Sequence, residues 1–231
     1  MEHHESATGH VTGQAVYIQD LNVSDRLLAG LVVYSPHARA GIKNFDLKNA
    51  LNYPGVEAVL SYRDIPGTNQ MGPVVHDEPC LAEKEVTFIG QAVFLIAAQN
   101  LEIAREAAKL IEISYQPLEP VLTLEKAIET GKKLAPPRKI VCGDLKKGFE
   151  SSAHQLEGSL TTGGQEHWYL ETQSAMAVPG EGSEVKVYSS SQHPSETQAI
   201  VAEVLGIARN EVEVEVKRMG GAFGGKETQA N

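Results

Sequence analysis

Short apolar runs separated by turns fill the first 130 residues and predict both strands and helices. Strands are predicted at 15–18, 28–34, 56–60, 91–98 and 111–115. Helices are predicted at 47–52, 101–110 and 123–130. Asn100 can cap the second helix, which carries Leu101, Ala104 and Ala108 on one face. Gly131 ends the third helix. These elements predict an α+β first domain over about residues 10–130.

A second set of elements follows the double proline Pro136-Pro137, which blocks helix continuation and favours an extended linker. Strands are predicted at 155–160, 185–189 and 211–217, and residues 166–178 fit neither period. A helix is predicted from Pro194 to Leu205, with Gly206 as its stop. We therefore expect an incomplete second α/β domain over residues 138–231.

The clearest strand of the chain is the alternating segment 211–217. It places Val212, Val214 and Val216 on one face, and its glutamates on the other. We expect the valine face to be buried, because a strand of a two-layer domain turns one face to the core.

Composition narrows the classes of function. The 231 residues are 42% hydrophobic and carry a formal net charge of -10. This is the balance of a globular protein, and the negative charge argues against nucleic-acid binding and against docking on an anionic membrane. No segment is long and apolar enough to span a bilayer, and the first 20 residues have no signal-peptide core. Cys80 and Cys142 form no CxxC pair, which disfavours an iron–sulfur or zinc site and fits a cytoplasmic location.

A glycine-rich segment follows the alternating strand, with the sequence MGGAFGGKE at residues 219–227. Gly220, Gly225 and Lys226 match the core of a nucleotide phosphate loop, but Glu227 stands where a Ser or Thr should hold magnesium. Such glycine density instead predicts a close approach of the backbone to a ligand. We expect Phe223 to project from the loop, with Lys226 and Glu227 at its rim.

A second polar segment reads GGQEHWYLET at residues 163–172. It lacks the HExxH spacing of zinc hydrolases, and His167 has no serine or cysteine partner at a recognisable elbow. A lone histidine seldom marks a site, so we expect His167, Trp168 and Tyr169 to form a partly buried polar-aromatic cluster.

Together, GGQEHWYLET and the later RMGGAFGGKE resemble the paired motifs of the xanthine dehydrogenase group of molybdenum hydroxylases. Segments that also resemble this family lie at residues 4–13, 35–38, 54–56, 88–93 and 190–194. The resemblance implies an aldehyde oxidase/xanthine dehydrogenase a/b hammerhead-like first domain at 10–130. It also implies that 138–231 is the truncated N-terminal part of a molybdopterin cofactor-binding domain. Ala222 stands where the family commonly has glycine, which is tolerated if its φ is negative.

The resemblance implies a molybdenum-molybdopterin cofactor and assigns site residues by position. Gln165 corresponds to a catalytic and cofactor-binding glutamine of the family. That glutamine lies near the molybdenum and contacts the metal's ligands, not the metal itself. The cofactor-binding loop corresponds to Gly221, Ala222, Phe223 and Gly224. Glu227 corresponds to the catalytic acid that hydrogen-bonds a purine substrate, a position that is typically not glutamate in relatives acting on aldehydes.

The family also implies partners. The remaining molybdenum-subunit polypeptide would supply a substrate-binding arginine, aromatic clamps and the general base. The 2Fe-2S clusters and FAD would lie on other subunits or domains. We therefore expect that the isolated chain binds no cofactor tightly, and that residues 220–225 are then solvent-exposed. A non-catalytic fragment or assembly module, and an aldehyde-oxidising relative, remain as alternatives to a purine-hydroxylating subunit that converts hypoxanthine and xanthine to urate.

Overall fold

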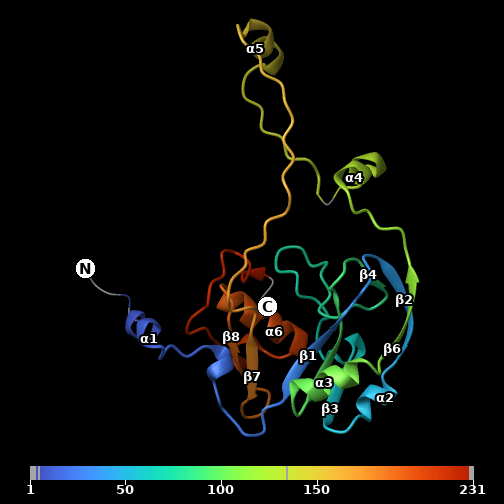
Figure 1. Ribbon diagram of the computed structural model, residues 1–231, viewed down its shortest axis with the longest axis vertical. Helices are drawn as coiled ribbons and strands as arrows, with labels where there is room; N and C mark the ends of the chain where they lie inside the picture. Colours follow the sequence, from blue (N-terminus) through green and yellow to red (C-terminus); the bar gives the residue numbers. More distant parts are fainter. Residues whose placement is uncertain (1–3, 5, 134, 229–231) are drawn as a thin grey trace. The chain divides into compact units, whose positions relative to one another are not determined.

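The structure, a computed structural model, describes residue 4, residues 6–133 and residues 135–228 (Figure 1). The chain divides into two compact units. The first joins Met1–Pro120 to His167–Asn231, and the second is Val121–Glu166. The fold is α+β, as the sequence predicts, and all of the strands described lie in the first unit.

The helices of the first unit are α1 (Ala7–Thr12), α2 (Lys48–Leu51), α3 (Leu101–Ala108) and α6 (Pro194–Leu205). Its 3₁₀ turns are η1 (Ile18–Asp20), η2 (Tyr62–Asp64) and η3 (Arg209–Glu211). Its strands are β1 (Ala29–Tyr34), β2 (Ala40–Asp46), β3 (Val56–Leu60), β4 (Glu85–Val86), β5 (Ala92–Ala98), β6 (Glu112–Pro117), β7 (Ala175–Pro179), β8 (Val185–Ser189) and β9 (Val212–Glu215). The second unit contains α4 (Leu124–Thr130) and α5 (Leu145–Ser151).

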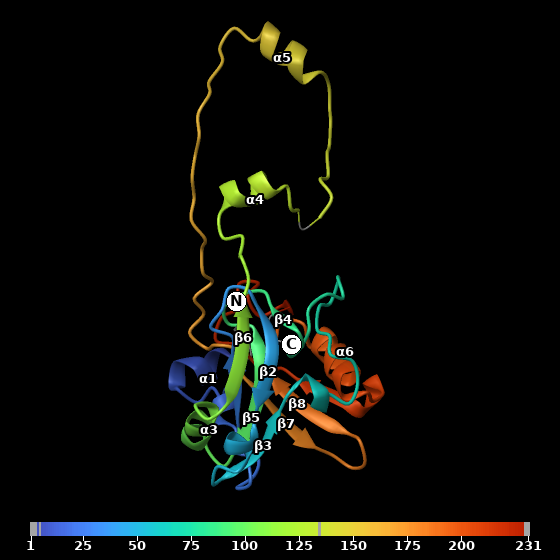
Figure 2. The same cartoon turned by 90° about the vertical axis from the view of Figure 1, so that its right-hand side faces the viewer.

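The strands form small sheets that Figure 2 shows from the side. One sheet has the order β1-β5-β3 and another has the order β4-β2-β6, both antiparallel. In the third, β7-β8-β9, β8 is antiparallel to β7 and parallel to β9. Helix α6 is the crossover that a parallel pair requires.

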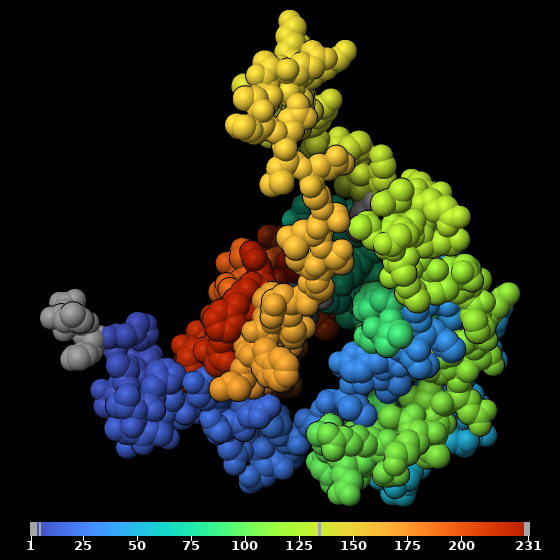
Figure 3. All heavy atoms as spheres, turned by 45° about the horizontal axis from the view of Figure 1, so that its top comes forward, coloured from blue at the N-terminus to red at the C-terminus, as the bar shows by residue number. Residues whose placement is uncertain are grey.

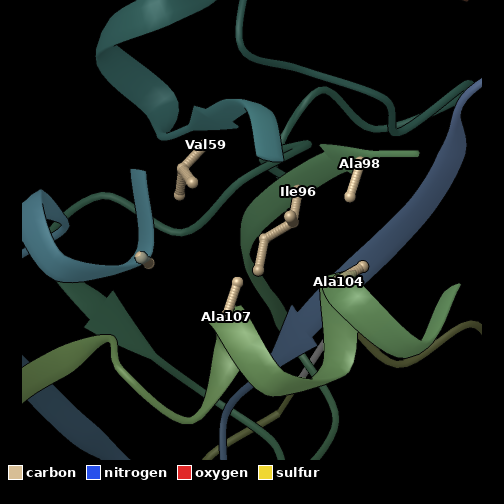
Figure 4. Close-up of a cluster of buried hydrophobic side chains, with 6 residues drawn as sticks. Val59, Ile96, Ala98, Ala104 and Ala107 are labelled. Carbon is tan, nitrogen blue, oxygen red and sulfur yellow. The ribbon is translucent and has the colours of Figure 1, made fainter. Parts of the chain in front are cut away.

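The main core lies between the β1-β5-β3 sheet and α3 (Figure 4). Ile96 and Ala98 of the central strand pack with Ala104 and Ala107 of the helix, and each of the four is at most 1% exposed. The Asn100 side chain accepts the Ile103 N–H at 2.9 Å, which confirms the predicted helix cap. Strand β5 also supplies residues to a second apolar cluster. Its nearly unbroken apolar sequence follows from this burial on both sides.

The third sheet confirms the predicted register of the valine segment. Val212 is 1% exposed and forms a cluster with Val187 and Ala202, against which Val214 packs. Glu213 and Glu215 instead reach Lys186 on the neighbouring strand. The predicted strand is shortened to Val212–Glu215, and Gly206 ends α6 with a φ of 69°.

Two predicted strands are wrong. Residues 15–17 form no strand, and Ile18 begins the 3₁₀ turn η1. Residues 155–160 are irregular, and Leu156 and Leu160 are fully or mostly exposed. A strand needs a neighbour to satisfy its N–H and C=O groups, and the second unit contains no strand among its described residues.

The sequence pattern missed α1, β2, β4 and α5, and it left the segment that contains β7 unassigned. Strand β2 includes Gly41, Lys43 and Asn44, so apolar and polar residues do not alternate strictly along it. Its pairing with β6 is also irregular. Helix α5 is capped by Asp144, whose side chain accepts the Lys147 N–H at 3.1 Å. Among the helices that the structure describes, none is long and apolar enough to cross a membrane.

Candidate functional site

The glycine loop, residues 220–227, follows β9 and is partly buried. Ala222 and Gly225 are buried, whereas Phe223 is 75% exposed and Gly224 and Glu227 are exposed. The expected projection of Phe223 is confirmed. The expected exposure of the whole stretch 220–225 is wrong, because side chains from two earlier segments hold the loop.

Gln192 is the first of these anchors and lies between β8 and α6. Its side-chain oxygen accepts the Gly224 N–H at 2.9 Å and the Lys226 N–H at 3.3 Å. Its backbone N–H donates to the Lys226 carbonyl at 2.7 Å. One residue therefore binds the backbone on both sides of Gly225, which fixes the last turn of the loop.

Glu171 is the second anchor. Its Oε2 accepts the Gly220 N–H at 2.7 Å and lies 3.0 Å from the Lys226 Nζ. The Lys226 side chain is 0% exposed and that of Glu171 is 11% exposed. The expectation that Lys226 stands at the rim is therefore wrong, because a buried carboxylate draws its ammonium inward. Glu227 is at the rim, as expected.

Aromatic side chains of the 163–172 segment pack against the loop. The Lys226 Nζ lies 5.0 Å from the centre of the Tyr169 ring, and the Tyr169 hydroxyl is 3.5 Å from the Gly225 carbonyl oxygen. His167 lies near Tyr169, with ring centroids 6.3 Å apart. Trp168 does not join them, since it is 82% exposed, and His167 is exposed as well. The expected partly buried cluster of three is therefore wrong, because only Tyr169 is half-buried.

Close packing explains why glycine is needed at Gly225. A Cβ added there would lie 2.6 Å from the Tyr169 Cε1 and 3.0 Å from the His167 Cγ. At Gly220 a Cβ would lie 2.5 Å from the Cβ of Glu171. The glycines thus let the loop backbone rest directly on the earlier segment. Figure 3 shows the orange and red spheres of this part of the chain packed side by side.

The exposed tip of the loop has an unusual backbone. Phe223 has a φ of 52°, which is uncommon for a residue with a side chain, and Gly224 has a φ of 92°. Ala222 is not among the residues with positive φ, so the condition that we set for alanine there is confirmed. A Cβ on Gly224 would meet only the His167 Nε2, at 4.0 Å, so this stretch of backbone is loosely covered. Strain of this kind gathers where a ligand is held.

The predicted site residues fall in different units of the chain. Gln165 is exposed and belongs to the second unit, whereas the other predicted site residues, Gly221, Ala222, Phe223, Gly224 and Glu227, belong to the first. Those five share one short turn, in which the Glu227 N–H donates to the Gly224 carbonyl at 3.3 Å.

The sequence reading missed Glu171 and Gln192 as anchors of the loop. Both lie within the motifs that carry the resemblance, but a hydrogen bond spanning 49 or 32 positions leaves no periodic signal.

The Oε1 of Glu171 is buried and has no hydrogen-bond partner among the described residues. Glu171 also lines an open cavity of about 520 Å³, together with Tyr17, Gln19, Asp20, Leu170, Thr172 and Gly220. Within the described ranges, no three His, Cys, Asp or Glu residues gather as metal ligands.

Two family models match successive parts of the chain. The aldehyde oxidase and xanthine dehydrogenase a/b hammerhead domain matches residues 12–119. The molybdopterin cofactor-binding domain matches residues 129–231, which include both polar motifs and both anchors of the glycine loop.

The chain is 43% identical over 227 residues to a xanthine dehydrogenase of Dictyostelium discoideum. It is also 42% identical over 229 residues to aldehyde oxidase 1 of Bos taurus. Each alignment covers 98% of this chain and 17% of the relative, so the chain spans about a sixth of the length of these proteins. The aldehyde oxidoreductase from Desulfovibrio gigas matches the fold with a TM-score of 0.86 at 25% identity, over 96% of this chain and 27% of that one.

Proposed function

Because the chain belongs to the xanthine dehydrogenase and aldehyde oxidase family of molybdenum hydroxylases, we propose that it supplies one wall of a purine-hydroxylating site. The wall is the glycine loop with its anchors. The rest of the site would come from the remaining polypeptide of the molybdenum subunit, since the chain spans 17% of its relatives.

The tip of the loop fits a bound molybdenum-molybdopterin cofactor. Phe223 is exposed at positive φ, and a Cβ on the exposed Gly224 would touch only the His167 Nε2, at 4.0 Å. A glycine backbone in this state can approach a large planar group closely. When bound, the cofactor supplies the two-electron oxidation, and residues 221–224 hold and orient it.

Glu227 carries the assignment to purines. Its carboxylate is exposed, three residues after Gly224, on a loop that Gln192 and Glu171 fix. A carboxyl group can hydrogen-bond the ring nitrogens and exocyclic oxygens of a purine, and it can stabilise one tautomer as charge shifts over the ring. A simple aldehyde offers only its carbonyl oxygen and none of the ring nitrogens. The chain is 43% identical to the xanthine dehydrogenase and 42% identical to the aldehyde oxidase, so overall identity does not favour either substrate class. The proposal of a purine substrate therefore rests on Glu227.

The further parts of the proposal come from the sequence. Gln165 would orient the metal's ligands as a neutral hydrogen-bonding residue. The 2Fe-2S clusters and FAD would lie on other domains or subunits, and the protein would act in the cytoplasm. The domain boundaries at 10–130 and 138–231 also stay predictions.

The test is Glu227→Val in the full-length enzyme that contains this chain. We expect kcat/KM for xanthine to fall by about a hundredfold or more, because a site built to hydrogen-bond its substrate loses strongly when that match is removed. The kcat/KM for an aromatic aldehyde should stay the same or rise. The matched control is Glu57→Val on the exposed side of β3, which should change neither constant. Equal losses on both substrates would show that Glu227 is structural and would reject the purine assignment.

A further inference from the structure

Lys226 is the most deeply buried charged side chain near the loop, and the proposed function gives it no part. Its side chain is 0% exposed, and its ammonium lies 3.0 Å from the Glu171 Oε2. A lysine next to a glycine-rich loop would ordinarily contact an anionic ligand. Here the ammonium is instead occupied by the Glu171 carboxylate and the Tyr169 ring.

The contact closes the loop. The same Oε2 that contacts the Lys226 Nζ also accepts the backbone N–H of Gly220. Gly220 is the first residue of the loop, and Lys226 directly precedes Glu227. One carboxylate oxygen therefore joins the two ends of the loop, and the Tyr169 ring packs on the ammonium from another side.

Burial makes this link hard to replace. An ammonium removed from water is stable only beside a compensating charge, so Lys226 and Glu171 each require the other. Gln192 holds the backbone of Lys226 at two points. The Gln192 N–H donates to the Lys226 carbonyl, and the Gln192 side-chain oxygen accepts the Lys226 N–H. With the backbone and side chain of Lys226 both held, the backbone that carries the Glu227 side chain is held as well, and the Glu227 N–H also donates to the Gly224 carbonyl at 3.3 Å.

We propose that Lys226 is a positioning residue that acts through Glu171 to aim the Glu227 carboxylate at the substrate and to hold the tip 223–224 in place. It touches neither substrate nor cofactor. The inference rests on the proposed function for its substrate, but the closure of the loop can be measured independently of any substrate.

The informative variant is the double substitution Lys226→Met/Glu171→Gln in the full-length enzyme. Methionine fills the space of the lysine, and glutamine retains an oxygen for the Gly220 N–H, so no unpaired buried charge remains. The single variant Lys226→Met leaves the Glu171 charge unpaired and should unfold at a lower temperature than the double variant. Lys217→Met, on an exposed lysine before the loop, is the matched control.

For the double variant we expect faster hydrogen exchange of the peptide covering residues 219–228 and a rise in KM for xanthine of roughly tenfold or more, since small displacements of a positioned group are costly. The kcat/KM for an aromatic aldehyde should fall much less than the kcat/KM for xanthine. Molybdenum content should stay above half of the wild-type value. Wild-type exchange together with a wild-type ratio of the two activities would overturn the proposal. Faster exchange together with equal losses on both substrates would reject Glu227 as the target of Lys226 while leaving the loop closure established.

Discussion

The side-chain oxygen of Gln192 lies 2.9 Å from the backbone nitrogen of Gly224 and accepts its N–H across 32 positions of sequence. The bond couples the junction of β8 and α6 to the exposed tip of the glycine loop. An exposed tip that carries a positive φ keeps its shape only when such bonds hold it, because nothing packs over it from outside.

Replacing Gln192 with leucine should therefore loosen the tip. The variant loses the acceptor for the N–H groups of Gly224 and Lys226, and we expect it to lower the free energy of unfolding by about 1–2 kcal/mol. Denaturant unfolding of the full-length enzyme measures this change. Gln192→Glu keeps an acceptor oxygen and is the control. Equal losses in both variants would mean that the bond to Gly224 adds nothing to stability.

The requirement for glycine at position 225 gives a second prediction. The Cβ of Gly225→Ala would lie 2.6 Å from the Tyr169 Cε1, so the ring or the loop must move, at a cost of about 1–3 kcal/mol. The thermal midpoint of the full-length protein should fall. Gly148→Ala inside α5, where a Cβ meets nothing within 4 Å, should leave the midpoint unchanged or raise it. An unchanged midpoint for Gly225→Ala would show that the packing of Tyr169 yields freely.

Gln165 gives a prediction that belongs to the proposed function. Gln165→Ala in the assembled enzyme should lower turnover while molybdenum content stays near that of the wild type, because a residue that orients a metal's ligands does not anchor the metal. Metal analysis and steady-state rates on the same preparation separate the two effects. Gln155→Ala, in the same unit, is the control. Complete loss of molybdenum in Gln165→Ala would contradict this role.

Lys186 links the neighbouring strands β8 and β9 and makes stability depend on pH. Its Nζ lies 2.8 Å from the Glu213 Oε1 and 2.9 Å from the Glu215 Oε2. Hydrogen bonding to Lys186 lowers the pKa of Glu215 below its ordinary value of 4.5, while bonds to both glutamates raise the pKa of Lys186 above 10.5. The stabilisation from Glu215 is therefore present above pH 4.5 and is lost as pH falls through the lowered pKa.

The thermal midpoint of Lys186→Met should accordingly lie below that of the wild type at neutral pH, and the difference should shrink as the solution is acidified below pH 4.5. Lys43→Met on β2 is the control, and its difference from the wild type should not follow pH in this way. A difference for Lys186→Met that stays constant from neutral pH to well below pH 4.5 would show that the ion pairs do not stabilise the sheet.

The sequence by itself determined the elements that depend on local interactions. Asn100 caps α3, Pro194 begins α6 and Gly206 ends it, because a cap, a fixed φ and a left-handed residue act within one turn of chain. The register of Val212 and Val214 also follows from the sequence, since slipping by one residue would bury glutamates. The two polar motifs located the candidate loop because each is short and contiguous.

Tertiary structure alone decided the features that depend on distant partners. Residues 155–160 are predicted as a strand but gain no neighbour to complete its hydrogen bonds. Strand β2 has little apolar alternation, yet it pairs with β4 and β6. The direction of the Lys226 side chain is the clearest case, because position 226 has the same neighbours in sequence whether its ammonium faces solvent or Glu171. The buried carboxylate that selects the inward direction lies 55 positions earlier, and the fold alone brings it within 3.0 Å.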